Sequence, residues 1–287
     1  MYLIFDIGGS STKVAIFDKS GNIIYKSKSK SKASYEDFLL DMKKLIDFSK
    51  QKGKLEKISI SSPGMVDICN KKSMGLSALG YLDNDFITEL QKYSKLERKD
   101  ILIENDGNCG ALGELFFDKN IRNFIYIVIG TGIGGAVVID RKLYRGSNFS
   151  AGEFGYMLLG DDDSNFSTLG TLPNVCKKLE KDKNISVDTF EMLKKHKLKE
   201  EPYYSYVEDM FNILARAIYN LYYCFDPEKI IIGGAISEDK YYMEKLKEKL
   251  NEKTYSYRKI DLISSKNFNE NNLYGAFYNI VGKKYEN

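Results

Sequence analysis

Apolar residues along the chain group into short strand-like segments that alternate with longer segments of helical spacing. Residues 2–25 predict an apolar strand, a glycine turn, a second strand, a tight turn and a third strand. Residues 124–144 repeat this order, with a glycine turn at 130–135. Because such self-similarity constrains the whole architecture, the sequence predicts a duplicated strand-turn-strand core.

The rest of the pattern fits two α/β halves, since strands that alternate with helices predict largely parallel sheets covered by helices. Further strands are expected at 57–61, 101–104 and 229–232, and helices at 35–52, 85–96, 108–117, 207–225, 239–251 and 270–281. We expect an N-terminal lobe of residues 1–117 and a C-terminal lobe of residues 118–266. The last helix, within 267–287, is expected to cross back and pack on the first lobe.

Composition narrows the classes of function. The 287 residues include 43 basic and 40 acidic ones, a net charge of +3, which is too balanced to favour nucleic acid or an anionic membrane as a partner. No apolar run has membrane-spanning length and the first residues do not resemble a signal peptide, so we expect a cytoplasmic protein. The four cysteines are scattered singly and predict neither a zinc site nor a disulfide framework.

Two lysine-rich segments, 26–32 and 194–199, are interpreted as solvated loops or helix faces, because neither has the interleaved aromatics of a nucleic-acid site. His196, the single histidine, lies in the second segment and is expected on an exposed helix. One histidine gives little support to a Ser-His-Asp triad or a multi-histidine metal site. Any general base is therefore expected to be a carboxylate.

Both glycine turns have the chemistry of phosphate-binding loops, because glycine lets the main chain approach a phosphate closely. Asp6, at the end of the first strand, could hold Mg²⁺ directly or through water. A hairpin without a ligand would explain either turn alone, whereas two turns at matched positions favour a nucleotide clamped between domains. The residues expected near the nucleotide in the first turn are Gly8, Gly9, Ser10, Ser11, Thr12 and Lys13.

Six motifs resemble those of the ROK family (repressors, open reading frames and sugar kinases) in order and approximate spacing, and the resemblance extends over residues 1 to 282. They are DIGGSSTK (6–13), SSPGMVD (61–67), ENDGN with ALGE (104–114), GTGIGG (130–135), AGEFG (151–155) and DPEKIIIGG (226–234). The resemblance implies a two-lobed actin-like ATPase (ribonuclease H-like) fold. It also implies transfer of the γ-phosphoryl group of ATP to a sugar bound in the cleft.

On that resemblance Asp106 would be the general base, with Asn105 orienting the sugar hydroxyl. Gly64 and Glu153 would also contact the sugar. The residues expected at ATP are Thr131, Gly132 and Gly134 for the phosphates, and Gly233 and Gly234 near the adenosine. Two plainer interpretations stay open: the Asn-Asp pair could only cap the following helix, and the last glycine pair could be an ordinary strand-to-helix turn.

The chain departs from the family pattern in ways that bear on zinc and the sugar. Many members have Glu-x-Gly-His and a cysteine-rich zinc loop, whereas residues 153–156 are Glu-Phe-Gly-Tyr and the only nearby thiol is Cys176, so we expect no zinc. Tyr156 would hydrogen-bond the sugar or pack against its loop. The segment 77–81 corresponds to a sugar-edge loop with Ser77 and Leu79 in place of the usual Asn and Pro. The additional sugar-binding glutamate of many relatives has no clear match.

Among zinc-free relatives, the resemblance favours N-acetylmannosamine as the acceptor over a β-glucoside. Segments 60–67 and 264–276 look most like bacterial N-acetylmannosamine kinases of sialic acid degradation, whereas 153–157 looks equally like β-glucoside kinases. Glucokinase is a further alternative, and in each case the C6 hydroxyl would be phosphorylated. A homodimer is expected, as is common in the family.

Two non-enzyme alternatives carry less weight. A sugar-responsive repressor would need a DNA-binding segment before Asp6, where we expect no room for one. A catalytically dead sugar sensor is disfavoured because Asp106 and both glycine turns are present.

Overall fold

The structure is a computed structural model that describes residues 1–75, 77, 79–160, 162–253, 259–267 and 270–282. Contacts divide the chain into two compact units. Unit 1 comprises Met1–Ile121, Leu143–Ala151 and Glu270–Asn287, and unit 2 comprises Arg122–Lys142 and Gly152–Asn269. The boundaries expected from the sequence at 117/118 and 266/267 differ from this division mainly in residues 143–151, which lie in unit 1.

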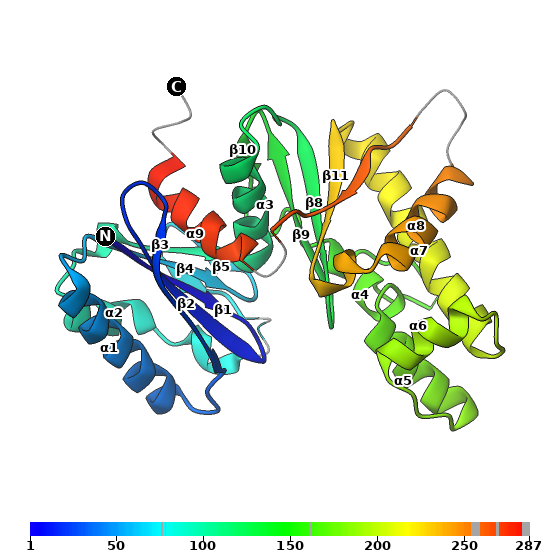
Figure 1. Ribbon diagram of the computed structural model, residues 1–287, viewed down its shortest axis with the longest axis horizontal. Coiled ribbons are helices and arrows are strands. Elements are labelled where there is room, and N and C mark those ends of the chain that lie inside the picture. The colour runs from blue at the N-terminus through cyan, green and yellow to red at the C-terminus, as the bar shows by residue number, and fades with distance from the viewer. Residues whose placement is uncertain (76, 78, 161, 254–258, 268–269, 283–287) are drawn as a thin grey trace. The chain divides into compact units, whose positions relative to one another are not determined.

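Unit 1 contains the first copy of the strand-turn-strand pattern (Figure 1). Its strands are β1 (Tyr2–Ile7), β2 (Ser11–Phe17), β3 (Ile23–Lys30), β4 (Lys57–Ser62), β5 (Val66–Asp67), β6 (Lys72–Ser73) and β7 (Ile101–Asn105). Its helices are α1 (Tyr35–Lys52), α2 (Phe86–Ser94), α3 (Asp106–Phe117) and α9 (Asn271–Val281), with short 3-10 helices η1 (Gly80–Asp83) and η2 (Arg98–Asp100).

The second copy of the strand-turn-strand pattern comes directly after α3. The strands are β8 (Phe124–Ile129), β9 (Ile133–Ile139), β10 (Lys142–Tyr144), β11 (Lys229–Gly233) and β12 (Leu262–Ser264). The helices are α4 (Phe166–Leu169), α5 (Leu172–Lys183), α6 (Thr189–Lys197), α7 (Tyr203–Phe225) and α8 (Lys240–Asn251), with 3-10 helices η3 (Phe154–Tyr156) and η4 (Ala235–Glu238).

The two main sheets have the same topology, which confirms the predicted duplication. Among the described residues one five-stranded sheet has the order β3-β2-β1-β4-β7 and the other has the order β10-β9-β8-β11-β12. In each, the first hairpin is antiparallel (β1 with β2, β8 with β9), and the strands after the helices pair in parallel. The fold is therefore the predicted α/β arrangement.

Strand β1 is buried on both faces, so alternate residues reach different helices. Leu3 and Phe5 join a cluster with side chains of α1 and α2, whereas Tyr2 and Ile4 pack with α9, including Phe277. Figure 1 accordingly shows α1 and α2 on one side of this sheet and α3 and α9 on the other. A strand covered on both faces reads as a continuous apolar run, which is the pattern of residues 2–5.

In unit 2 the isoleucines of β8 and β11 pack against a long amphipathic helix. Ile127 and Ile232 belong to one cluster with Phe211, Leu214 and Ile218 of α7. Side chains of α5 and α8 complete that cluster. This core supports the strand ends from which the second glycine turn and the later glycine pair emerge.

The expectation of an exposed histidine is wrong. His196 is fully buried between helices, with Nε2 3.0 Å from Glu208 Oε1 and Nδ1 2.9 Å from the Tyr241 hydroxyl. Burial lowers the pKa of His196, so the ring is neutral at pH 7. It packs the helices α6, α7 and α8 together and takes no part in the candidate site.

The lysine-rich segment 26–32 is mostly a solvated strand, not the expected loop or helix face. Residues 26–30 belong to β3, the edge strand of the first sheet, with Lys28 and Lys30 exposed and the intervening Ser29 half-buried. Lysines along an edge strand oppose pairing with another sheet, which explains the composition. The segment 194–199 is an exposed helix end, as expected, apart from its histidine.

Candidate active site

The first glycine turn connects β1 to β2. Strand pairing continues to Ile7 and Thr12, and within the turn the Gly8 amide donates to the Ser11 carbonyl at 3.0 Å. Gly9 and Ser10 are exposed at its tip. The turn therefore presents main chain and a hydroxyl to solvent, as a phosphate-binding loop requires.

Asp6 lies at the base of this turn and is held by three side chains. Its Oδ1 accepts hydrogen bonds from Ser61 at 2.9 Å and Asn272 at 3.2 Å, and its Oδ2 pairs with Lys13 Nζ at 3.2 Å. Only 8% of the Asp6 side chain is exposed. Each carboxylate oxygen has two lone pairs, so a carboxylate held this way suits water-mediated contact with Mg²⁺ bound to phosphates.

The predicted base lies at the same sheet edge. Because β1, β4 and β7 are parallel neighbours, Asp6, Ser61 and Glu104 are in register and their strands end together. Asn105 follows Glu104, and Asp106 begins α3 directly, two residues earlier than expected. The carboxyl edge of these parallel strands thus joins the first glycine turn to the proposed base, the usual position of ligand sites in such sheets.

Asn105 both caps α3 and reaches the two neighbours predicted to contact sugar. Its Oδ1 accepts from the Asn108 amide at 2.9 Å, and its Nδ2 donates to the Gly64 carbonyl at 3.0 Å and to Asp106 Oδ1 at 3.2 Å. The Gly107 amide also donates to Asp106 Oδ1, at 2.8 Å. Asn105 therefore does cap α3, and the same side chain also holds the carboxylate of Asp106.

Glycine is required at position 64. The residue has φ of +81°, and a Cβ there would lie 2.7 Å from the Gly75 carbonyl oxygen. Residue 64 can therefore lie this close to Gly75 only without a side chain, and in this position its carbonyl lies beside Asn105. Ala78 of the expected sugar-edge loop lies outside the described residues; in its described part Ser77 Oγ accepts from the Leu79 amide at 3.0 Å.

In unit 2 the second glycine turn connects β8 to β9 and is supported from outside the hairpin. The Gly130 amide donates to the Gly132 carbonyl at 2.9 Å, and Thr131 is exposed. Ser167 Oγ accepts from the Ile133 amide at 2.9 Å. The sequence did not identify Ser167, because its contact joins residues 34 positions apart.

Glu153 and Tyr156 follow a segment that packs closely on β9. A Cβ on Gly152 would lie 2.8 Å from the Gly135 carbonyl, and one on Gly155 would lie 2.1 Å from the Ile133 carbonyl. The short helix η3 is therefore anchored beside the second glycine turn. Burial raises the pKa of the Glu153 carboxyl. Tyr156 is 53% exposed, so its phenol is not packed into the core.

The pair Gly233-Gly234 at the end of β11 lies where side chains would not fit. A Cβ on Gly233 would lie 2.0 Å from the Tyr126 hydroxyl, and one on Gly234 would lie 2.2 Å from the Ile129 carbonyl. Gly234 also has φ of +87°. Because Ile129 is the residue before the second glycine turn, both glycine segments of unit 2 meet at the end of β8. Gly134 lies in the same hairpin, on β9.

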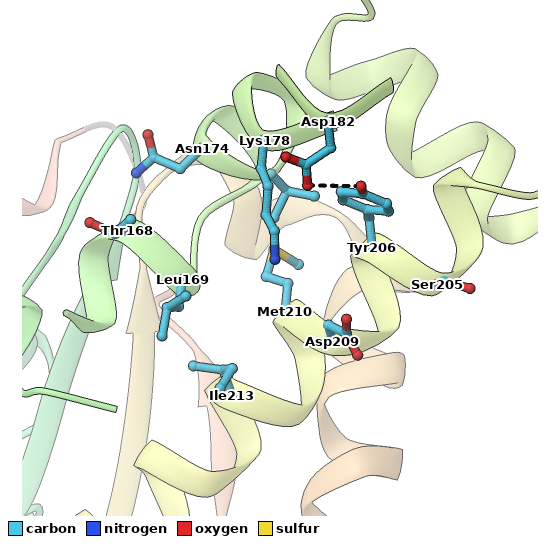
Figure 2. A pocket seen from close by; sticks show the side chains of 11 residues that line it. Thr168, Leu169, Asn174, Lys178, Asp182, Ser205, Tyr206, Asp209, Met210 and Ile213 are labelled. Carbon is cyan, nitrogen blue, oxygen red and sulfur yellow. Dashed lines mark hydrogen bonds between the residues drawn. The ribbon is translucent and has the colours of Figure 1, made fainter. Parts of the chain in front are cut away.

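A pocket of about 270 Å³ lies between α4, α5 and α7 of unit 2 (Figure 2). Thr168, which follows the Ser167 that contacts the second glycine turn, lines it. Lys178 projects into the pocket, and Asp182 Oδ2 accepts a hydrogen bond from the Tyr206 hydroxyl at 2.9 Å. No sequence pattern indicated this pocket, since α5 was not predicted.

The predicted site residues fall into two sets. Unit 1 holds Asp6, residues 8–13, Gly64, Asn105 and Asp106, and unit 2 holds Thr131, Gly132, Gly134, Glu153, Tyr156, Gly233 and Gly234. Each set is local to strand ends of its own sheet. Among the described residues, no group of three or more His, Cys, Asp or Glu side chains is arranged to hold a metal ion. Within the same residues, no helix combines the length and apolarity needed to cross a bilayer.

Comparison with known proteins places the chain in a family. The model of the ROK family matches residues 2–282. A β-glucoside kinase from Klebsiella pneumoniae is 30% identical over 86% of this chain and 85% of its own length. An N-acetyl-D-glucosamine kinase from Histophilus somni is 27% identical over 94% of this chain and 95% of its own length.

Solved structures support the same assignment. A ROK family protein from Streptococcus pneumoniae, in complex with sucrose, has a TM-score of 0.85 at 27% identity over 98% of this chain and 99% of that one. A candidate N-acetylmannosamine kinase from Listeria monocytogenes has a TM-score of 0.89 at 25% identity over 99% of both chains. These likenesses confirm the actin-like ATPase fold, and with the family model they show that the chain belongs to the ROK family.

Proposed function

We propose that this chain transfers the γ-phosphoryl group of ATP to the C6 hydroxyl of a sugar, with Asp106 as the general base. As a ROK family member whose named relatives are sugar kinases, the chain is a sugar phosphotransferase. The observation that carries the specific mechanism is the carboxyl edge of β1, β4 and β7. That edge holds a phosphate-type turn at Asp6 and a fixed carboxylate at Asp106.

The residues of unit 1 divide the work of phosphoryl transfer between them. Asp106 accepts the proton of the attacking hydroxyl, and its orientation comes from the Gly107 amide and the Asn105 side chain. Asn105 and the Gly64 carbonyl hold the sugar hydroxyls nearby. Such transfer depends mainly on positioning and charge neutralisation, so one carboxylate suffices without histidine.

We assign nucleotide contacts to the glycine turn of each unit. Lys13 and the main chain of Gly9 and Ser10, at the exposed tip of the first turn, neutralise phosphate charge, and Thr131, Gly132 and Gly134 contact phosphate from unit 2. Mg²⁺, when bound, shields the phosphate oxygens; Asp6 would hold it through water, consistent with a cation that prefers one or two carboxylates plus substrate phosphates. Thr168 lines the pocket of Figure 2 and follows Ser167, which contacts Ile133 after the second turn, and on this link we assign the pocket, with Gly233 and Gly234, to the adenosine end.

Two sugars are candidate acceptors, and the similar proteins support them to different degrees. A β-glucoside, or glucose itself, is favoured by the Klebsiella kinase at 30% identity and by a second β-glucoside kinase, from Listeria innocua, also at 30% identity. N-acetylmannosamine, in sialic acid degradation, is supported by segments 60–67 and 264–276 and by the Listeria monocytogenes structure at 25% identity. We therefore rank a β-glucoside first and N-acetylmannosamine second, the reverse of the order expected from the sequence.

Further parts of the proposal concern Glu153, Tyr156 and the molecular context. Glu153 accepts hydrogen bonds from sugar hydroxyls, and the exposed Tyr156 phenol replaces the family histidine. The enzyme uses no zinc, because the ligand set of the family is missing from the sequence. It acts in the cytoplasm as a homodimer.

The decisive experiment is a coupled ADP-release assay with Mg-ATP across cellobiose, glucose, N-acetylmannosamine, N-acetylglucosamine and mannose. Product analysis by NMR locates the phosphate. Turnover that depends on one sugar, with phosphate on C6, supports the kinase. Sugar binding in calorimetry without sugar-dependent ADP release would instead identify a sensor.

A further inference from the structure

Glu104 brings a buried negative charge next to the proposed base. It precedes Asn105 at the end of β7, and only 1% of its surface is exposed. A buried carboxylate is strongly destabilising unless it is paired and hydrogen-bonded. The hydrogen-bond partners of Glu104 therefore help to hold the end of β7 in place.

Arg145 provides the counter-charge. Its Nε and Nη2 donate to the same oxygen of Glu104, Oε2, at 2.9 and 2.7 Å. Arg145 belongs to the segment Leu143–Ala151, which lies in unit 1, and its side chain is 27% exposed. The planar guanidinium holds the Glu104 carboxylate in one direction and also balances its negative charge.

The other oxygen of Glu104 holds the turn that carries the base. Oε1 accepts from the Asn105 amide at 3.1 Å and from Asn108 Nδ2 at 2.8 Å. Asn105 in turn caps α3 and donates to Asp106 Oδ1. Glu104 therefore connects an arginine 41 residues away to the first turn of α3 and its catalytic carboxylate.

We infer that Arg145 is a positioning residue for phosphoryl transfer, acting through Glu104 on Asn105 and Asp106. Without the guanidinium, Glu104 turns toward water or another donor and releases the amide and side-chain contacts at Oε1. The base then loses its fixed direction while the phosphate-binding turns stay intact. The kinetic test rests on the proposed kinase function, and a structural test below does not.

The first experiment compares Arg145→Gln, Arg145→Lys and a matched control, Arg122→Gln, which removes an arginine from an exposed pair with Asp140. We expect Arg145→Gln to lower kcat by about 10- to 100-fold, the scale of a misplaced reacting group. KM for ATP should stay within about twofold, because the loss is confined to the sugar-activating side. Arg145→Lys should recover part of kcat, and the control should match the wild type.

A double-mutant cycle with Glu104→Gln separates positioning from direct substrate contact. If Arg145 acts through Glu104, adding Arg145→Gln to the Glu104→Gln enzyme should lower kcat by less than about threefold. An equal loss in both backgrounds would mean that the guanidinium touches substrate, and would overturn the inference. So would unchanged kcat in Arg145→Gln accompanied only by a lower Tm, which marks a purely structural pair.

Crystal structures of the wild type and Arg145→Gln test the same coupling without activity. We expect the Asp106 carboxylate and the Asn105 side chain to move in the variant. If the wild type turns over no sugar, the proposed function fails, while displaced side chains at 105 and 106 still support the positioning role. An unmoved turn would refute it in either case.

Discussion

Replacement of Asp106 by Asn removes a charge and a proton acceptor while leaving the local hydrogen bonds in place. The carbonyl oxygen of the introduced amide can still accept from the Gly107 amide, which lies 2.8 Å from Oδ1 in the wild type, and from Asn105 Nδ2. General bases contribute about 10²- to 10⁴-fold to rate, so kcat should fall by that factor, about 3–5 kcal/mol in the barrier. Loss of an acidic residue from the first turn of α3 should cost only about 0.3–1 kcal/mol of stability.

The assay is sugar-dependent ADP release at saturating ATP, with sugar affinity measured separately by calorimetry. Asp37→Asn is a matched control, because Asp37 also lies in the first turn of a helix, α1, is exposed and is not among the predicted site residues. We expect both variants to lose similar small amounts of stability and to bind sugar, with only Asp106→Asn losing turnover. Activity of Asp106→Asn within about threefold of the wild type would refute the base assignment.

Three further predictions concern packing, pH and the nucleotide. Gly275→Ala should lower Tm by about 3–10 °C, because its Cβ would lie 1.7 Å from the Cys109 carbonyl and overpacking costs about 1–3 kcal/mol. The control in the thermal melts is Gly80→Ala, whose Cβ would meet no atom within 4 Å. Burial raises the pKa of the Glu153 carboxyl above its ordinary 4.5, so the stability that comes from its neutral form is lost as pH rises through the pKa of the folded state. Glu153→Gln should therefore melt about 1–3 °C higher than the wild type at pH 7, with no gain below pH 4. The same variant should bind sugar more weakly in calorimetry. Lys178→Met should raise KM for ATP by about tenfold with unchanged sugar affinity in calorimetry. If the variant and the wild type have the same KM for ATP, the pocket is not part of the nucleotide site.

The sequence predicted the elements that alternate apolar strands with glycine turns and missed those with weak apolar signals. The β1–β2 and β8–β9 hairpins were expected because each combines two buried strands with a glycine turn. Helix α5 is lysine-rich and β12 has three residues, so periodicity alone could not define them, and α6 was expected only as an exposed helix around His196, without bounds. The capping signals of both helices were present: Pro173 is the second residue of α5, and Asp188 caps α6.

Two errors have a physical cause in tertiary context. Alternating lysine and serine in β3 is the signature of a solvated edge strand, and period-two spacing could have identified it. The burial of His196 could not be found from its lysine-rich neighbours, since Glu208 and Tyr241, which bind its ring, come from other helices. Local composition gives the helix, and packing decides which of its faces is buried.

For the candidate site, motif residues were predictable and their supporting partners were not. Asp6, Asn105 and Asp106 stand at strand ends in recognisable segments. Asn272 and Arg145, which hold Asp6 and Glu104, have no motif of their own, because their contacts depend on pairings 266 and 41 residues apart. Chemistry that lies within one turn is readable from sequence, whereas the second layer that orients it requires the fold.

The C-terminal helix illustrates how that second layer works. Asn271, fully buried at the start of α9, donates from Nδ2 to the Gly110 carbonyl at 2.7 Å and to Glu114 Oε1 at 3.0 Å, both on α3. Its neighbour Asn272 donates to Asp6 Oδ1 at 3.2 Å. Two successive residues therefore tie α3, which begins at the proposed base, to the carboxylate beneath the first glycine turn. Because a displacement of one reacting group by about 1 Å can cost 10²-fold in rate, we expect the docking of α9 to matter for the proposed catalysis as well as for stability.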